Sequence, residues 1–324
     1  MARGEKWRIV GFGLAGVCLA WRLHERGEVF EWCDTERPEA ASRVAAGLIN
    51  PVTGKNFEPS WRLGEFLPEA VSFFRHIEET TGEEFWHPLP IHRWVSAKDW
   101  KKVEGKLERP EVAEWVERVD GGQGDWHAVV VLKGGGRLNV RRFCEASARF
   151  FAERRRESLT PGRVLRCEGA TGLMSGQWGE HRCAKGEILT GEIPGWDEGK
   201  IEIGGGGWLI PIGGGCFKAG ATYEWEELDG RPTRDGAEKV MAILRRLGVE
   251  HFVLQQHEAG VRPIVRRSMP LIGVLENGEV GFNGLGSKGS LYAPGVSRRL
   301  VDWLVDGGAI EESLDVGLWR KSHA

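Results

Sequence analysis

Hydrophobic and polar positions in the first 34 residues follow the order strand, helix, strand. Trp7–Val10 is a short, mainly apolar run typical of a buried strand. Gly27 is placed to end the helix predicted after this strand. Val29–Cys33 predicts a second short strand, closed by Asp34. Between the two strands, apolar residues recur at a spacing that gives a helix one apolar face: Val17, Leu19, Ala20 and Leu23. The chain is therefore expected to begin with a β-α-β unit.

Three glycines occupy the turn between the first strand and the helix, at the spacing GxGxxG. Gly11 allows a tight turn, Gly13 lets the backbone approach a diphosphate, and Gly16 lets the helix pack closely on the strand. The helix N-terminus adds free N–H groups and a positive dipole end. Asp34, 18 residues beyond Gly16, is placed to accept hydrogen bonds from a ribose. The pattern predicts a site for an ADP-containing cofactor, with contacts from Gly11, Gly13, Leu14, Ala15, Gly16 and Asp34.

A different interpretation of the same stretch is an export signal, because basic residues precede an apolar run. The helix, second strand and terminal acid that follow argue against it. We therefore expect a cytoplasmic protein.

Later segments predict further elements. Residues 127–132 (HAVVVL) and 215–225 (GCFKAGATYEW) are strand-like, and Asn139–Arg156 predicts an amphipathic helix. Its arginines are interpreted as a solvated outer face, with a nucleic-acid patch as the less favoured alternative. No apolar run approaches the ~20 residues that span a bilayer.

Composition is that of an ordinary globular chain long enough for two cores. Of 324 residues 41% are hydrophobic and 28% charged, and the formal net charge of -3 gives no general reason to expect nucleic-acid or membrane binding. Small molecules are therefore the expected partners. The six cysteines contain no CxxC pair and no zinc-like spacing, so we interpret them as buried thiols in a reducing compartment rather than disulfides, and predict no metal site.

The segment ASRVAAGLINPVTGKNFEPSW, residues 41–61, is rich in small residues and by itself suggests a loop passing close to something flat. It resembles the second flavin-contacting segment of the D-amino acid oxidase and glycine oxidase superfamily. The resemblance implies that Ser42 and Arg43 lie near the pyrophosphate and that the backbone of Ala46, Gly47 and Leu48 runs beside the isoalloxazine ring. FAD then replaces NAD as the expected cofactor.

Three later stretches resemble the same superfamily: residues 162–173, 207–225 and 259–304. The resemblance implies an α/β fold, with a discontinuous Rossmann-like FAD-binding domain and an inserted α+β substrate domain built on an antiparallel or mixed sheet. We expect the FAD-binding domain to comprise residues 1–60, 138–183 and 259–324, and the substrate-binding domain residues 61–137 and 184–258.

Arg262, in GVRP, matches the family arginine that pairs with a substrate carboxylate, a task that suits the two parallel donors of a guanidinium. The alternative is an interdomain salt bridge. Arg266 and Arg267 are weaker candidates. Relatives commonly place a tyrosine hydroxyl near the substrate, and Tyr223, expected on a pocket-lining strand, is favoured over Tyr292.

Residues 282–290 (FNGLGSKGS) are expected to pass beside the flavin, where Lys288 would place positive charge near the pyrimidine side of the ring. His87 and His92 are expected to be structural or gating residues. The remaining cofactor contacts implied by the resemblance are Gly169, Gly284, Gly286, Ser287, Lys288 and Gly289.

Several positions depart from the family pattern. Many relatives have an acid where this chain has Arg267, and the glycine oxidase branch has an arginine at the position of Ser287, so substrate identity is open. The sarcosine oxidase branch has a flavin-linked cysteine just before the Arg-Pro pair. Residues 259–261 (AGV) offer no thiol, which predicts noncovalent FAD.

The resemblance implies oxidation of a C–N bond in an amino acid or related amine, with hydride transfer to flavin N5 and hydrolysis of the imine. Molecular oxygen or an electron acceptor would reoxidise the flavin. Two alternatives stay open: an RNA-linked amine substrate, and a flavin-binding protein without turnover. The oligomeric state and the substrate's stereochemistry are not predicted.

Overall fold

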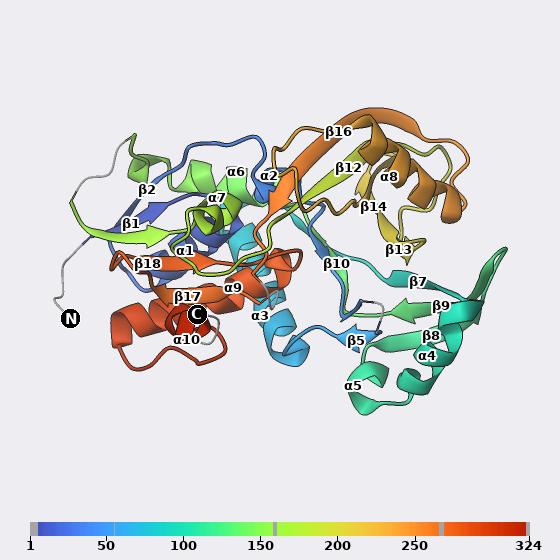
Figure 1. Ribbon diagram of the computed structural model, residues 1–324, viewed down its shortest axis with the longest axis horizontal. Helices are drawn as coiled ribbons and strands as arrows, with labels where there is room; N and C mark the ends of the chain where they lie inside the picture. The colour runs from blue at the N-terminus through green and yellow to red at the C-terminus, as the bar shows by residue number, and fades with distance from the viewer. Residues whose placement is uncertain (1–5, 55, 158–160, 266–268, 322–324) are drawn as a thin grey trace.

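The computed structural model describes residues 6–54, 56–157, 161–265 and 269–321 (Figure 1). Its first layer is a five-stranded sheet in the order β17-β18-β11-β1-β2. Four strands run parallel and β17 is antiparallel to β18. The strands are β1 (Trp7–Val10), β2 (Phe30–Cys33), β11 (Arg163–Arg166), β17 (Leu271–Val274) and β18 (Val280–Asn283). The sequence prediction of a Rossmann-like β-α-β start is confirmed, with β1 at its expected bounds.

Helices cover this sheet, and the four longest of them bury their apolar faces in the largest core. The two short ones contribute Leu173, Val316 and Trp319 to a separate core. On α1 the residues predicted to form the apolar face are fully buried, each buried leucine or valine contributing about 1.5–3 kcal/mol. Trp21 of α1 donates from Nε1 to Ser147 Oγ of α6 at 2.9 Å, which satisfies two buried polar groups. The helices are α1 (Leu14–Glu25), α3 (Leu63–Thr81), α6 (Val140–Phe150), α7 (Gly169–Met174), α9 (Gly289–Asp306) and α10 (Val316–Lys321).

The second layer is an eight-stranded mixed sheet, on the right of Figure 1, in the order β16-β12-β15-β14-β13-β7-β9-β8. β13 and β7 run parallel, and the other neighbours run antiparallel. Its strands are β7 (Ile91–Ser96), β8 (Val116–Gly121), β9 (Trp126–Leu132), β12 (Ala184–Glu192), β13 (Ile201–Gly204), β14 (Gly207–Gly213), β15 (Cys216–Gly220) and β16 (Val253–Arg262). Two further cores lie against it, under α4 (Ala97–Leu107) with α5 (Pro110–Ala113), and under α8 (Arg234–Arg246).

Two small sheets complete the fold. β10 (Gly136–Leu138) lies between β3 (Leu48–Ile49) and β6 (Trp86–Pro88), and β4 (Val52–Thr53) pairs with β5 (Glu58–Pro59). Gly47, just before β3, has φ +73°, and a Cβ there would lie 1.8 Å from the carbonyl oxygen of Leu138. Only glycine lets these two backbones approach so closely.

The predicted strand through residue 225 is wrong at its end, because β15 stops at Gly220. Residues 221–223 leave the ladder, and Glu224 returns to β12 only as an isolated antiparallel bridge with Lys185. The Glu224 carboxylate then accepts hydrogen bonds from the backbone N–H groups of Trp225 and Glu226, where the chain bends away. The helix predicted to reach Arg156 likewise ends at Phe150 and is followed by a 3-10 turn, η1 (Ala152–Arg154).

The domain division remains a prediction. Strand β16 runs across the expected boundary between residues 258 and 259, and α3, within 61–137, contributes to the core of the five-stranded sheet.

The exposed arginines of α6 and the segment after it are paired with carboxylates: Arg142 and Arg149 with Glu83, Arg155 with Glu36, and Arg156 with Glu31.

All six cysteines are free thiols, and Cys18, Cys167 and Cys183 are buried. Within the described ranges, no three His, Cys, Asp or Glu side chains gather in a metal-binding arrangement. Over the same ranges, no helix combines the length and apolar character needed to cross a bilayer.

Candidate active site

The turn between β1 and α1 requires its glycines. Gly11 has φ +90°, and a Cβ there would lie 2.5 Å from the carbonyl oxygen of Cys167. A Cβ on Gly16 would lie 2.0 Å from the carbonyl oxygen of Gly11, so α1 can sit this close to the turn only without a side chain at that position. The sequence roles assigned to both glycines therefore follow from the backbone geometry.

The N-terminus of α1 is open to an anion. Gly13 is its N-cap, with no side chain to cap the first N–H groups, and no acidic residue occupies the first turn. Ser42, at the start of α2 (Ala41–Val44), places its Oγ 2.9 Å from the backbone nitrogen of Leu14. The remaining N–H groups and the helix dipole suit a diphosphate. The glycine cradle and the serine hydroxyl beside it fit the phosphates of FAD.

The predicted ribose and phosphate residues lie at the same edge. Asp34 follows β2 directly, and the backbone nitrogen of Gly11 donates to the carbonyl oxygen of the preceding Cys33 at 2.9 Å. Arg43, on α2, forms an ion pair of 3.7 Å with Glu36. Asp34 is thus placed beside the glycine turn, as its spacing predicts.

A cavity of about 1320 Å³ extends from this edge to the eight-stranded sheet. It exceeds the 300–1,000 Å³ typical of drug-sized ligand pockets, which suits a dinucleotide together with a second molecule. The predicted site residues that line it are Leu14, Ser42, Ala46, Gly47, Leu48, Tyr223, Arg262, Gly286, Ser287, Lys288 and Gly289.

Two of the predicted cofactor residues outside the cavity lining, Gly169 and Gly284, are linked through Asn283. Gly169 begins α7, and its carbonyl oxygen accepts a hydrogen bond of 2.8 Å from Asn283 Nδ2. Asn283 Oδ1 in turn accepts from the backbone nitrogen of Gly284 at 2.8 Å. The amide of Asn283 therefore fixes the end of β18 where the chain turns toward the cavity. Asn283 was not identified from the sequence.

Arg262 lies at the end of β16 with its guanidinium 4.3 Å above the ring centre of Tyr223. Its Nη1 donates to the carbonyl oxygen of Thr222 at 3.1 Å. A Cβ on Gly186 of β12 would lie 2.0 Å from Nη2, so this glycine makes room for the side chain. Among the described residues no carboxylate lies within 4.0 Å of Arg262, which gives the salt-bridge alternative no partner there. Burial lowers the pKa of Arg262, but an arginine remains protonated in proteins.

Tyr223 lies in the irregular stretch after β15, not on the predicted strand, and is 52% exposed. Its hydroxyl is 3.0 Å from Ser287 Oγ, in the loop before α9. The next residue, Lys288, donates from Nζ to Thr53 Oγ1 at 3.0 Å, and burial lowers the pKa of its ammonium group. Tertiary structure thus gathers three predicted residues, Arg262, Tyr223 and Lys288, on one wall of the cavity.

Some predicted residues lie elsewhere. His87 and His92 do not line the cavity, although burial lowers the pKa of both imidazoles. Arg266 and Arg267 lie outside the described residues. Tyr292 lines the cavity but is almost completely buried, and burial raises its pKa to about 12.

Further polar residues line the cavity without having been predicted, among them Asn50 and Arg93. Asn50 lies within the flavin-like segment 41–61, and its buried Oδ1 accepts no hydrogen bond from the described residues. Arg93 lies on β7, next to His92. The sequence around Arg93 contains no motif that indicates a site, because β7 approaches the cavity only through the packing of the second sheet.

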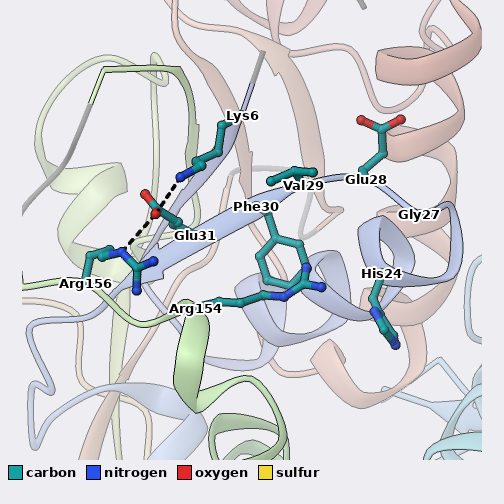
Figure 2. A pocket seen from close by; sticks show the side chains of 9 residues that line it. All are labelled: Lys6, His24, Gly27, Glu28, Val29, Phe30, Glu31, Arg154 and Arg156. Atoms are coloured by element: carbon teal, nitrogen blue, oxygen red, sulfur yellow. Dashed lines mark hydrogen bonds and ion pairs between the residues drawn. The ribbon is translucent and has the colours of Figure 1, made fainter. Parts of the chain in front are cut away.

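A smaller hollow of about 450 Å³ lies at the opposite end of β2 (Figure 2). Figure 2 shows Glu31 between Lys6 and Arg156, and the distances from its Oε1 to their nitrogens are 2.7 and 2.9 Å. Open α/β sheets bind ligands at the carboxyl ends of their strands, whereas this hollow faces the start of β2. We therefore place the active site in the larger cavity.

The glycine cradle at the carboxyl end of β1 and the cavity between two sheets define a dinucleotide-dependent enzyme of the two-layer flavoprotein type. The chain belongs to the DAO family of FAD-dependent oxidoreductases, whose family model matches residues 6–303. FAD is therefore its cofactor, and the expected replacement of NAD by FAD is confirmed.

Individual proteins are similar over nearly the whole chain. The uncharacterized oxidoreductase YurR of Bacillus subtilis (strain 168) is 23% identical over 91% of this chain and 94% of its own length. The iminodiacetate oxidase structure (IdaA) from Chelativorans sp. BNC1 has a TM-score of 0.79 at 17% identity, covering 95% of this chain and 98% of that one. Glycine oxidase from Bacillus cereus ATCC 14579 has a TM-score of 0.78 at 17% identity, covering 96% and 97%. These structures confirm the fold expected from the sequence.

Proposed function

We propose that the protein oxidises a C–N bond in a small amine that carries a carboxylate. The observation that carries this proposal is Arg262, a half-buried cation on the cavity wall with no carboxylate partner among the described residues. A guanidinium placed in this way can bind a ligand carboxylate through two parallel N–H groups. Similar folds belong to enzymes named for the oxidation of glycine and iminodiacetate, which are compounds of this class.

The residues of the wall divide the work of binding and orientation. Arg262 holds the carboxylate, and the Tyr223 ring beneath the guanidinium fixes its plane. The hydroxyl pair of Tyr223 and Ser287 offers hydrogen bonds to a polar group on the adjacent atom of the substrate. FAD, when bound, supplies the acceptor for the hydride of the carbon next to nitrogen. The protein therefore contributes mainly by orienting the substrate in a partly water-excluded cavity.

The direct test is the visible spectrum of the FAD-loaded protein under anaerobic conditions. Glycine, sarcosine, proline, iminodiacetate and the D- and L-amino acids are added one at a time. We expect at least one of these carboxylated amines to bleach the flavin bands, while matched carboxylates without nitrogen leave them oxidised. Bands that persist with every amine would contradict the proposed function and leave the family assignment intact.

We predict that FAD is bound without a covalent link. The residues before the Arg-Pro pair, Ala259 to Val261, contain no thiol, and the nearby Cys183 is buried. Precipitating the holoprotein with acid should release all of its yellow flavin into the supernatant. Flavin fluorescence retained on the denatured polypeptide in a gel would show that the prediction is wrong.

A further inference from the structure

The charged residues that line the cavity are strongly unbalanced. In the described part of the lining there are four cationic side chains and one carboxylate: Arg93, Lys98, Arg262 and Lys288, with Asp99. The whole chain has a formal net charge of -3, so the positive excess is local. The diphosphate of FAD fits the backbone N–H groups at the N-terminus of α1. Positive charge beyond that needed by one substrate carboxylate therefore remains.

Arg93 is a second, half-buried arginine of this wall. Its guanidinium lies 4.9 Å from the ring centre of Phe57, and Nη1 and Nη2 donate to the carbonyl oxygens of Val52 and Gly54 at 3.0 and 2.6 Å. These carbonyls are neutral, and no carboxylate of the described chain lies within 4.0 Å. Burial lowers the pKa of Arg93 to about 10, with Asp99 opposing the shift from farther away. Three of its five N–H groups are left for a ligand.

Arg93 and Arg262 stand at the two ends of one continuous series of contacts. The turn at residues 52–54 binds Arg93 through its carbonyls and Lys288 through the Thr53 hydroxyl. Ser287, next to Lys288, contacts the Tyr223 hydroxyl, and Arg262 covers the Tyr223 ring. Two half-buried guanidinium groups thus line one cavity and are linked by a series of polar contacts.

We propose that the substrate carries two anionic groups, its α-carboxylate bound by Arg262 and a second carboxylate bound by Arg93. This inference rests on the proposed function, because it names the substrate class of the same site. Lys98, exposed at the start of α4, and Lys288 add positive charge without an ion pair to a described carboxylate. A dicarboxylic amine would give each arginine a carboxylate partner, whereas a monocarboxylic amine leaves the half-buried Arg93 with neutral carbonyl partners alone.

Binding of non-reactive acids tests this directly. Succinate and glutarate are compared with their monoamides, succinamate and glutaramate, which have nearly the same shape and one charge fewer. Binding is followed by the change in visible absorbance of the FAD-loaded protein. We expect each dianion to bind about 30-fold more tightly than its monoamide. In Arg93→Met this preference should fall below about 3-fold, with monoamide affinity retained. Equal affinities in the wild type, or a preference that survives in Arg93→Met, would overturn the proposal.

Control variants separate recognition from folding. Arg118 on β8 is exposed and paired with Glu117 and Asp120, so Arg118→Met should leave both affinities unchanged. FAD content and melting temperature are measured for every variant, because Arg93 also supports the turn at residues 52–54. If Arg93→Met does not fold, Arg93→Lys decides: loss of the guanidinium fork should lower the preference at least threefold, and an unchanged preference refutes the role of Arg93.

The same panel distinguishes this inference from the proposed function. Amines that bleach the flavin while dianions show no preference would refute the second carboxylate and leave C–N oxidation standing. A dianion preference that depends on Arg93, without reduction by glutamate, aspartate or the other amines, would support the two-anion site and refute amine oxidation.

Discussion

Replacing Arg262 by alanine is expected to weaken carboxylate binding about 100-fold while FAD content stays close to that of the wild type. Truncating one partner of a buried charge pair costs about 2–5 kcal/mol, and 2.7 kcal/mol corresponds to about 100-fold. The guanidinium contacts Thr222 and Tyr223 on the substrate side of the cavity, away from the glycine cradle. The measurements are the apparent Michaelis constant for the best amine of the panel and the ratio of FAD to protein.

Two variants make this result specific. Arg262→Lys keeps the charge but loses the fork, so its affinity should lie between those of the wild type and Arg262→Ala. Arg231 is highly exposed, and Arg231→Ala should change neither quantity. An unchanged Michaelis constant in Arg262→Ala would remove this residue from the substrate site, and a parallel loss of FAD would indicate a structural role instead.

Replacing Gly13 by alanine is expected to weaken FAD binding about 30-fold. The new Cβ would lie 2.9 Å from Ser42 Oγ, which is held by its hydrogen bond from Leu14. The methyl group must either displace this hydroxyl or occupy the path of the diphosphate, and such overpacking costs about 1–3 kcal/mol. Apoprotein titrated with FAD, followed by quenching of flavin fluorescence, gives the dissociation constant.

The matched control is Gly105→Ala, within α4. A Cβ there meets no atom within 4 Å, so FAD affinity should not change, and the folded state should gain up to about 1 kcal/mol from helix propensity. Equal FAD affinities for Gly13→Ala and the wild type would show that the diphosphate does not approach α1 along this path.

The cofactor half of the site was predictable because its signals are local. Gly11, Gly13 and Gly16 lie within six residues, between a strand and a helix. Their spacing alone predicts the tight turn, the close approach of the backbone to a diphosphate and the close packing of the helix on the strand. The ends of the strands were harder to predict from the sequence. The segment through Tyr223 continues a strand-like pattern, but the ladder ends at Gly220 and only Glu224 pairs again, as an isolated bridge with Lys185.

Sequence by itself determined the β-α-β start, the dinucleotide site and, through resemblance, the FAD-dependent family. Only tertiary structure decided which residues share the substrate wall. Lys288 meets Thr53 across 235 positions of the chain, and Arg93 joins the same turn from the second sheet. Contacts of this kind depend on how two sheets pack against each other. The local pattern of hydrophobic and polar residues does not encode that packing. The pattern specifies the type of each strand or helix and its buried face, but not which distant residue that face will contact.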